Sequence, residues 1–152
     1  MFKKENELVD YIYDFLSSSL NTQEQNIFIN KEGKLKYTLP NNKELTHKSD
    51  ILISNISKNK LISIEVKYKS NVTDAFKARS YDIHNMKNNY REQLFCIIIF
   101  VKPKGKNTGL SIEKARDICY PFDLFFGINE EELIGNNEFK ILAEKIFDYI
   151  SV

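Results

Sequence analysis

The apolar residues of the chain recur at two spacings, and the first of these predicts helices. Residues 5–20 place Leu8, Ile12 and Leu16 on one face of a helix. Residues 137–150 show the same period, so each of these two segments is predicted to bury one stripe against a core. Two further helices are predicted, one over residues 74–90 with Thr73 as its N-cap, and a short one that follows Ser111 and ends before Pro121.

Other apolar segments are short and bounded by turn residues, which predicts strands. Residues 94–101 form an uninterrupted apolar run, as expected of a central strand buried on both faces. Residues 49–54 and 61–69 are predicted to be neighbouring strands joined by a polar turn. The order of elements predicts an α/β domain with a central mixed β-sheet flanked by helices on both sides. The remaining predicted strands are 25–30, 34–39 and 123–128, the first two forming a hairpin around 31–34 that is followed by a turn at 40–43.

Length and composition narrow the class of protein. A chain of 152 residues without repeats or linkers is expected to form one domain, 1–152. Its hydrophobic content of 42% rules out a wholly disordered chain, and no apolar run approaches the ~18–20 residues of a membrane helix. No signal peptide is recognisable, and two isolated cysteines, Cys96 and Cys119, predict neither a disulfide framework nor a zinc site. A protein of the reducing cytoplasm is expected.

The net charge of +1 conceals a strong asymmetry along the chain. Residues 1–30 carry 2 lysines against 5 acids, and residues 117–152 carry 2 lysines against 8 acids. Residues 31–116 carry 18 Lys and Arg against 8 acids, a net charge of +10. A basic segment of this kind suits a face that binds a polyanion such as nucleic acid. The alternative is a lysine-rich surface that is simply solvated.

The candidate catalytic residues lie in these two neighbouring strands. Side chains alternate across a strand. One face of 61–69 is therefore predicted to carry Leu61, Ser63, Glu65, Lys67 and Lys69, and the other face Ile62, Ile64, Val66 and Tyr68. Asp50 begins the preceding strand and is expected to lie close to Glu65. Two neighbouring carboxylates suit Mg²⁺ or Mn²⁺, and a lysine beside the metal can orient or deprotonate water. The alternative is an ordinary surface ion pair on a solvent-facing strand.

The acid-x-Lys tripeptide by itself is weak evidence, because the chain contains it three times. Glu32-Gly-Lys34 lies in a predicted turn, and Glu138-Phe-Lys140 lies on a predicted helix. Only Glu65-Val-Lys67 ends a predicted strand whose predecessor begins with an aspartate.

Asp50 followed by Glu65-x-Lys67, with a helix before and a helix after, resembles the PD-(D/E)XK nuclease superfamily, which includes type II restriction enzymes and Holliday-junction resolvases. The resemblance covers residues 5 to about 101 and implies a restriction-endonuclease-like core. It implies that Asp50 and Glu65 bind divalent metal, that Val66 lends its backbone carbonyl, and that Lys67 acts on the attacking water. The family's proline before the aspartate is replaced by Ser49.

The same resemblance suggests supporting residues. An acid on the first helix faces the site in many members, and Glu5, which shares the apolar stripe, is the candidate for a further metal ligand. The alternative for Glu5 is a favourable acid in the first helical turn. Candidates for nucleic-acid binding are Lys69 on the strand and, on the helix 74–90, Lys77, Arg79, Tyr81 and Lys87, each of which has a solvated surface residue as its alternative.

Three other features are less specific. His47 and His84 are isolated; His47, three residues before Asp50, could approach the site, but a lone loop histidine is more often a surface residue. The lysines of 102–106 suit a phosphate contact or a soluble loop. The helix 137–150 is expected in the core, with dimerisation through it possible because small nucleases that cut two strands often pair two active sites.

The favoured hypothesis is therefore a Mg²⁺- or Mn²⁺-dependent deoxyribonuclease, a hydrolase of DNA phosphodiester bonds that is either junction-resolving or of a small restriction type. The alternative is a non-catalytic module that retains the nuclease fold to bind nucleic acid or another subunit. In a third reading the fold is unrelated and the motif arises by chance.

Overall fold

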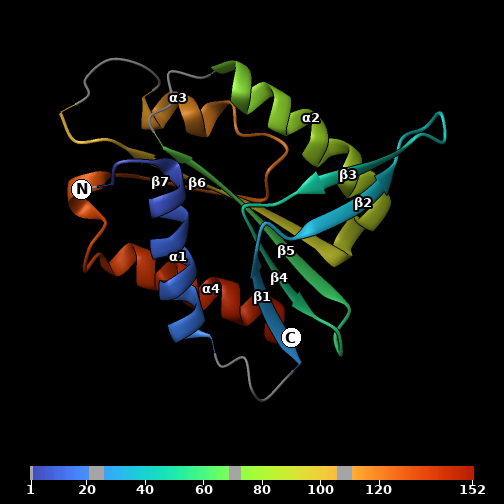
Figure 1. Cartoon of the computed structure of the whole chain (residues 1–152), viewed down its shortest axis with the longest axis horizontal. Helices are drawn as coiled ribbons and strands as arrows, with labels where there is room; N and C mark the ends of the chain where they lie inside the picture. The colour runs from blue at the N-terminus through green and yellow to red at the C-terminus, as the bar shows by residue number, and fades with distance from the viewer. Residues whose placement is uncertain (1, 21–25, 69–72, 106–110) are drawn as a thin grey trace.

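The computed structural model describes the backbone of residues 2–20, 26–68, 73–105 and 111–152, and the side chains of these residues except 73–79. A five-stranded sheet with the order β1-β4-β5-β6-β7 forms its centre (Figure 1). The pairings of β1 with β4 and of β4 with β5 are antiparallel, whereas β5, β6 and β7 run parallel, so the sheet is mixed. The strands are β1 (Ile27–Lys31), β4 (Ile51–Asn55), β5 (Lys60–Tyr68), β6 (Leu94–Lys102) and β7 (Leu124–Asn129).

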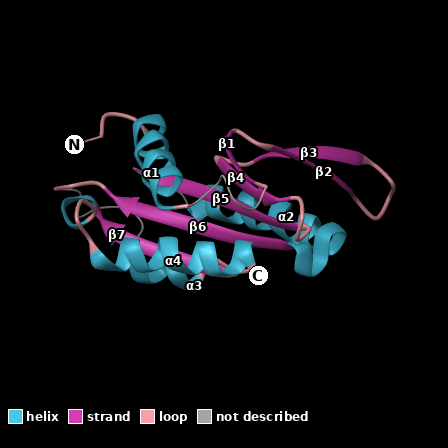
Figure 2. Ribbon diagram, turned by 90° about the horizontal axis from the view of Figure 1, so that it is seen from below, coloured by secondary structure: helices cyan, strands magenta, loops and turns pink. Residues whose placement is uncertain are grey.

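Helices cover both faces of this sheet, which confirms the predicted α/β architecture (Figures 1 and 2). The apolar stripes of α1 and α4 pack with Ile62, Ile64 and Val66 of β5 on one face. On the other face, Ile83 and Met86 of α2 pack with the alternate residues of β6. The helices are α1 (Glu5–Ser19), α2 (Thr73–Tyr90), α3 (Ile112–Asp117) and α4 (Asn137–Ser151), with short 3-10 turns at η1 (Arg91–Gln93) and η2 (Glu130–Glu132).

Two helix starts show why the chain turns into a helix where it does. Ser111 Oγ accepts a hydrogen bond from the Lys114 N–H at 3.1 Å, as its predicted capping role requires. Asn136 Oδ1 accepts one from the Phe139 N–H at 3.1 Å. Each cap satisfies an amide that the first turn leaves without an intrahelical partner.

The predicted hairpin between residues 25–30 and 34–39 is wrong. The strand β1 pairs with β4, and β2 (Lys34–Thr38) pairs with β3 (Glu44–Lys48), a strand that the sequence pattern did not reveal. The β2–β3 pairing continues the register of the β1–β4 pairing. The strands β1 and β2 therefore form one arm of a long antiparallel ribbon, and β3 and β4 form the other. The ribbon reverses at the turn predicted over residues 40–43, where the Asn42 N–H donates to Leu39 O at 2.9 Å.

A bend divides this ribbon at residues 32–33 and 49–50. Its hydrogen bonds continue through the bend, from the Glu32 N–H to Asp50 O at 3.0 Å and from the Ser49 N–H to Gly33 O at 2.8 Å. A Cβ on Gly33 would lie 2.4 Å from Leu52 Cβ, so the close crossing requires glycine. Beyond the bend, Leu35 and Tyr37 of β2 pack in the cluster of α2, and the β2–β3 hairpin extends outward beside α2 (Figure 1).

A buried carboxylate ties the N-terminal segment to the sheet. Glu130 is 3% exposed and accepts hydrogen bonds from the Phe2 N–H, the Tyr68 hydroxyl and the Lys104 N–H at 2.9–3.0 Å. Burial alone would raise the pKa of Glu130, but these donors outweigh it and lower the pKa from 4.5 to about 2. Burial and the bond to Glu130 raise the pKa of the Tyr68 hydroxyl to about 12. The anion of Glu130 therefore stabilises the fold.

This shift makes a prediction about acid stability. Because the pKa of Glu130 is lower in the folded state, its contribution of about 3 kcal/mol is present above pH 4.5 and is lost as the pH falls toward 2. We expect Glu130→Gln to lower the free energy of unfolding at pH 7, with the gap to the wild type narrowing between pH 4.5 and 3. Urea unfolding at several pH values measures this, with the exposed neighbour Glu131→Gln as control. A constant gap across that range would contradict the assignment.

Within the part of the chain that the structure describes, no helix is both long enough and apolar enough to cross a membrane.

Candidate metal and catalytic site

Asp50 and Glu65 face each other where β4 begins. The β4–β5 register pairs Ile51 with Ile64, and its continuation by one residue places Asp50 opposite Glu65. Each lies one position along the chain from an isoleucine that packs on α1 and α4. Because side chains alternate between the two faces, both residues point to the face covered by α2 and the β2–β3 hairpin. The register thus places opposite each other the two residues that the sequence predicted to be neighbours.

Beyond Ile64, the backbone amides at this edge of β5 donate to carboxylates instead of to a neighbouring strand. Pairing with β4 stops at Ile64, and the next amides directed to that edge are those of Val66 and Tyr68. The Val66 N–H donates to Asp50 Oδ2 at 2.7 Å, and the Tyr68 N–H donates to Glu5 Oε2 at 3.0 Å. Glu5 therefore does reach the same strand as the predicted site, as its place on the helical stripe suggested.

Glu65 is wholly buried, so the alternative of a solvent-facing surface ion pair is wrong. Its partner is His47 of β3, whose Nε2 lies 2.5 Å from Glu65 Oε1. His47 is 3% exposed, and the expectation that it is a surface loop residue is also wrong. The bend in the ribbon carries β3 over β5 and brings this imidazole onto the carboxylate. His84, by contrast, is exposed as expected.

Ser49 stands at the position of the family's proline and makes hydrogen bonds of its own. Its hydroxyl lies 2.6 Å from the hydroxyl of Ser63 on β5, and both side chains are wholly buried. Its N–H is bonded to Gly33 O, a contact that proline cannot make. The residue before Asp50 is thus fixed by hydrogen bonds to both β5 and the other arm of the ribbon.

The remaining predicted residues are placed less fully. Lys67 is partly buried on β5, on the face of Glu65. Tyr81 of α2 is 61% exposed and accessible to a partner. Lys69 lies outside the described residues, and Lys77 and Arg79 belong to α2 but their side chains lie outside the described part.

Two other predicted basic positions have intramolecular partners. Lys87 Nζ lies 2.6 Å from Asp123 Oδ2, and the Cys96 N–H donates to the same carboxylate oxygen at 2.8 Å, so Lys87 joins α2 to the sheet. In the loop after β6, the Lys104 N–H holds Glu130. The ion pair with Asp123 favours a structural role for Lys87 over a phosphate contact, whereas the Lys104 contact involves only its backbone amide.

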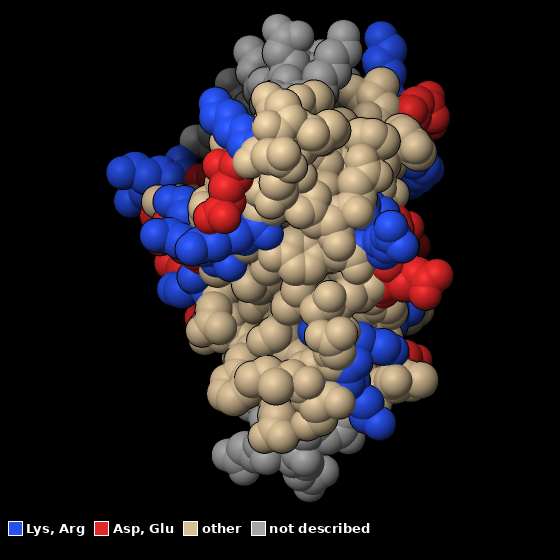
Figure 3. Space-filling view, turned by 90° about the vertical axis from the view of Figure 1, so that its right-hand side faces the viewer, with Lys and Arg blue, Asp and Glu red and all other residues tan. Residues whose placement is uncertain are grey.

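The basic charge of the middle segment lies on the surface. The β2–β3 hairpin exposes four lysines, Lys34, Lys36, Lys43 and Lys48. In the face shown in Figure 3, Lys and Arg side chains lie along both margins, interspersed with Asp and Glu, and uncharged side chains fill the middle.

The donor set at Asp50 and Glu65 fits Mg²⁺ or Mn²⁺. Over the described residues there is no group of three or more His, Cys, Asp and Glu placed to hold a metal, so Glu5, Asp50 and Glu65 do not form one cluster. Mg²⁺ does not require one, because it is commonly bound by one or two carboxylates, waters and substrate phosphates. In that mode Asp50, Glu65 and the Val66 carbonyl would be the hard oxygen ligands, all from one strand pair.

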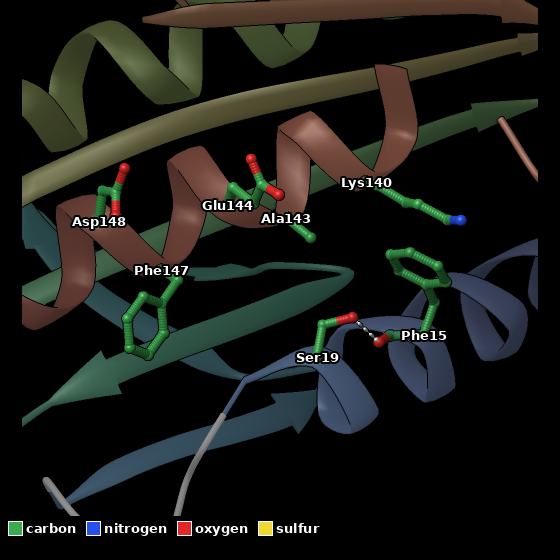
Figure 4. A pocket seen from close by; sticks show the side chains of 7 residues that line it. All are labelled: Phe15, Ser19, Lys140, Ala143, Glu144, Phe147 and Asp148. Carbon is green, nitrogen blue, oxygen red and sulfur yellow. Dashed lines mark hydrogen bonds between the residues drawn. The ribbon is translucent and has the colours of Figure 1, made fainter. Parts of the chain in front are cut away.

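A groove of about 460 Å³ lies on the opposite side of the sheet, between α1 and α4 (Figure 4). Phe15 and Ser19 of α1 face Lys140, Ala143 and Phe147 of α4 across it, and Ser19 Oγ donates to Phe15 O at 2.8 Å. None of the predicted catalytic residues lines it. The groove and the carboxylates are therefore separate features.

Comparisons with known proteins support the fold alone. No protein-family model matches the chain, and a search of curated proteins found no match. A solved structure, protein VC1899 from Vibrio cholerae, matches 96% of this chain with a TM-score of 0.51 and 15% sequence identity. The match covers 33% of that protein, so the chain spans about a third of its length.

Proposed function

We propose that the protein is a divalent-metal-dependent endonuclease that hydrolyses phosphodiester bonds in DNA. The observation that carries the proposal is the placement of Asp50 opposite Glu65, with Lys67 next on the same face of β5. The burial of Glu65 adds to it, because a carboxylate taken fully out of water is costly and is retained where it has a task. The resemblance to PD-(D/E)XK nucleases rests on these same residues.

Each residue has a role in this proposal. Asp50, Glu65 and the Val66 carbonyl hold Mg²⁺ or Mn²⁺, and Glu5 fixes the end of β5 through the Tyr68 amide. The bound metal would supply charge stabilisation at the phosphate and a more acidic water. Lys67 orients that water and offsets the negative charge that develops on phosphorus. The amide of Val66 holds the Asp50 carboxylate in place at 2.7 Å.

The proposed substrate follows from charge. The net charge of +10 over residues 31–116 includes the exposed lysines of the hairpin next to the site. Phosphate contacts of this kind give affinity without sequence preference. Lys69, Lys77, Arg79 and Tyr81 remain the proposed DNA contacts. We further propose a cytoplasmic homodimer, with α4 and its half-exposed Ile141 as the dimer surface.

Cleavage assays test the proposal. Supercoiled plasmid and a four-way junction are incubated with the purified protein in Mg²⁺, in Mn²⁺ and in EDTA. We expect cutting in either metal and none in EDTA, and the preferred substrate separates a junction-resolving enzyme from a general endonuclease. Salt-sensitive binding of both substrates without cutting would instead identify a non-catalytic binding module, and absence of both would show that the motif arose by chance.

A further inference from the structure

His47 lies between two carboxylates that come from different parts of the fold. Its Nε2 is 2.5 Å from Oε1 of Glu65 on β5, and its Nδ1 is 3.8 Å from Oδ2 of Asp82 on α2. The imidazole is 2% exposed and the Glu65 side chain 0%, whereas the Asp82 side chain is 35% exposed. The three groups thus run from the surface of α2 to the buried end of the proposed metal site.

We propose that His47 is a positioning residue for Glu65 and that Asp82 orients His47, so that this pair sets the affinity of the site for its divalent cation. The inference rests on the proposed function, because it assigns Glu65 to the metal. Ligating carboxylates are themselves commonly held by hydrogen bonds from neighbouring groups, which fix their rotamer before the cation binds.

The contacts around His47 support an orienting role beyond filling space. The ribbon bend, which requires Gly33, places β3 so that His47 meets Glu65, while its neighbours in β2 supply apolar packing. Asp82 is itself held, because the Tyr37 hydroxyl donates to its Oδ1 at 3.4 Å. One end of the imidazole is therefore in hydrogen-bond contact with Glu65, and the other faces the Asp82 carboxylate at 3.8 Å, so the two acids together favour one orientation of the ring.

The arrangement also connects α2 to the metal site. Asp82 follows Tyr81, the exposed residue of α2 proposed to contact DNA, by one position. A group on the DNA-facing helix thus reaches the proposed ligand through one histidine. For this reason the effect of Asp82 on the metal is expected to pass through His47 and to vanish when His47 is replaced.

Binding of Mn²⁺ without DNA tests the inference, measured from the EPR signal of unbound Mn²⁺. His47→Leu removes the donor and is expected to weaken Mn²⁺ affinity by roughly 10–100-fold. His47→Gln can place an N–H near the Nε2 position and is expected to stay within about 3-fold of the wild type, which a merely space-filling role would not produce. The exposed His84→Gln is the matched control.

Asp82→Asn supplies a second, milder test. It is expected to weaken Mn²⁺ affinity by a smaller factor, about 3–10-fold, and to add nothing in the His47→Leu background. Thermal unfolding of each variant reports whether the fold persists, and should His47→Leu not fold, His47→Gln and Asp82→Asn carry the test.

The outcomes separate this inference from the proposed function. A wild-type protein that binds Mn²⁺, with folded His47→Leu and Asp82→Asn variants of unchanged affinity, overturns the positioning role and leaves the nuclease proposal standing. A loss of affinity in His47→Gln as large as in His47→Leu also overturns it. A wild-type protein that binds no Mn²⁺ overturns the metal centre itself.

Discussion

Lys67→Ala is expected to cut DNA roughly 10²–10⁴-fold more slowly than the wild type while binding it with nearly the same affinity. Lys67 lies on the face of β5 that carries Glu65 and is partly exposed, so its removal leaves no large cavity. The proposed role of its amine, orienting water and offsetting charge on phosphorus, matters most in the transition state. One phosphate contact at most is lost from the DNA-binding surface.

Lys140→Ala is the matched control for this variant. Lys140 ends the tripeptide Glu138-Phe-Lys140, which has the same acid-x-Lys pattern but lies exposed on α4. Single-turnover cleavage and a gel-shift titration on both variants separate the chemical step from binding. Equal cleavage by Lys67→Ala and Lys140→Ala would remove Lys67 from the mechanism.

Asp50→Asn is expected to abolish metal-dependent cutting with little change in the fold. An amide oxygen can still accept the hydrogen bond that the Val66 N–H donates to Asp50 Oδ2 at 2.7 Å, so the edge of β5 stays closed. The charge that holds the cation is lost. The loss of Mn²⁺ affinity is expected to exceed the roughly 10–100-fold effect typical of a residue that only supports a ligand.

Asp10→Asn is the corresponding control, because Asp10 forms an exposed ion pair with Lys31 at 2.9 Å and has no part in the site. Mn²⁺ titration and urea unfolding of both variants measure affinity and stability separately. A stable Asp50→Asn protein that binds Mn²⁺ like the wild type would assign the cation to other residues.

Helix stripes and the apolar strand runs made most of the sheet predictable from sequence. Residues 94–101 match β6, and the stripe that begins at Leu8 matches α1, because each buries a continuous apolar surface that local spacing reveals. The pairing of Asp50 with Glu65 followed from strand alternation and a short turn. These are local signals in which neighbours in sequence are neighbours in space.

The ribbon was not predictable in the same way. Glu32 and Gly33 have the composition of a hairpin turn, but Glu32 adopts φ 56° at a bend, and the chain continues forward. The burial of β3 alternates, but one of its two inward residues is the polar His47, so only Leu45 gives an apolar signal in the sequence. The chain has two candidate turns, and the partner strand β4 determines which of them reverses the ribbon. That strand is distant in sequence, so local spacing does not reveal the answer.

The position of His47 was missed for the same reason. Its burial results from the bend, which carries β3 over β5, and from contact with Glu65, which is 18 residues away. One signal was present in the sequence: a wholly buried carboxylate needs a donor, and His47 is the nearest imidazole to Asp50 along the chain.

Nicking of supercoiled plasmid, followed as Mg²⁺ is added back to EDTA-treated protein, tests the central claim most directly. Wild type and Asp50→Asn, purified identically, are compared at the same DNA-binding saturation. The account predicts that wild-type nicking rises with Mg²⁺ to a plateau and that Asp50→Asn stays at the EDTA baseline. Nicking that persists in EDTA, or that is equal in the two proteins, would contradict a metal-dependent nuclease centred on Asp50 and Glu65.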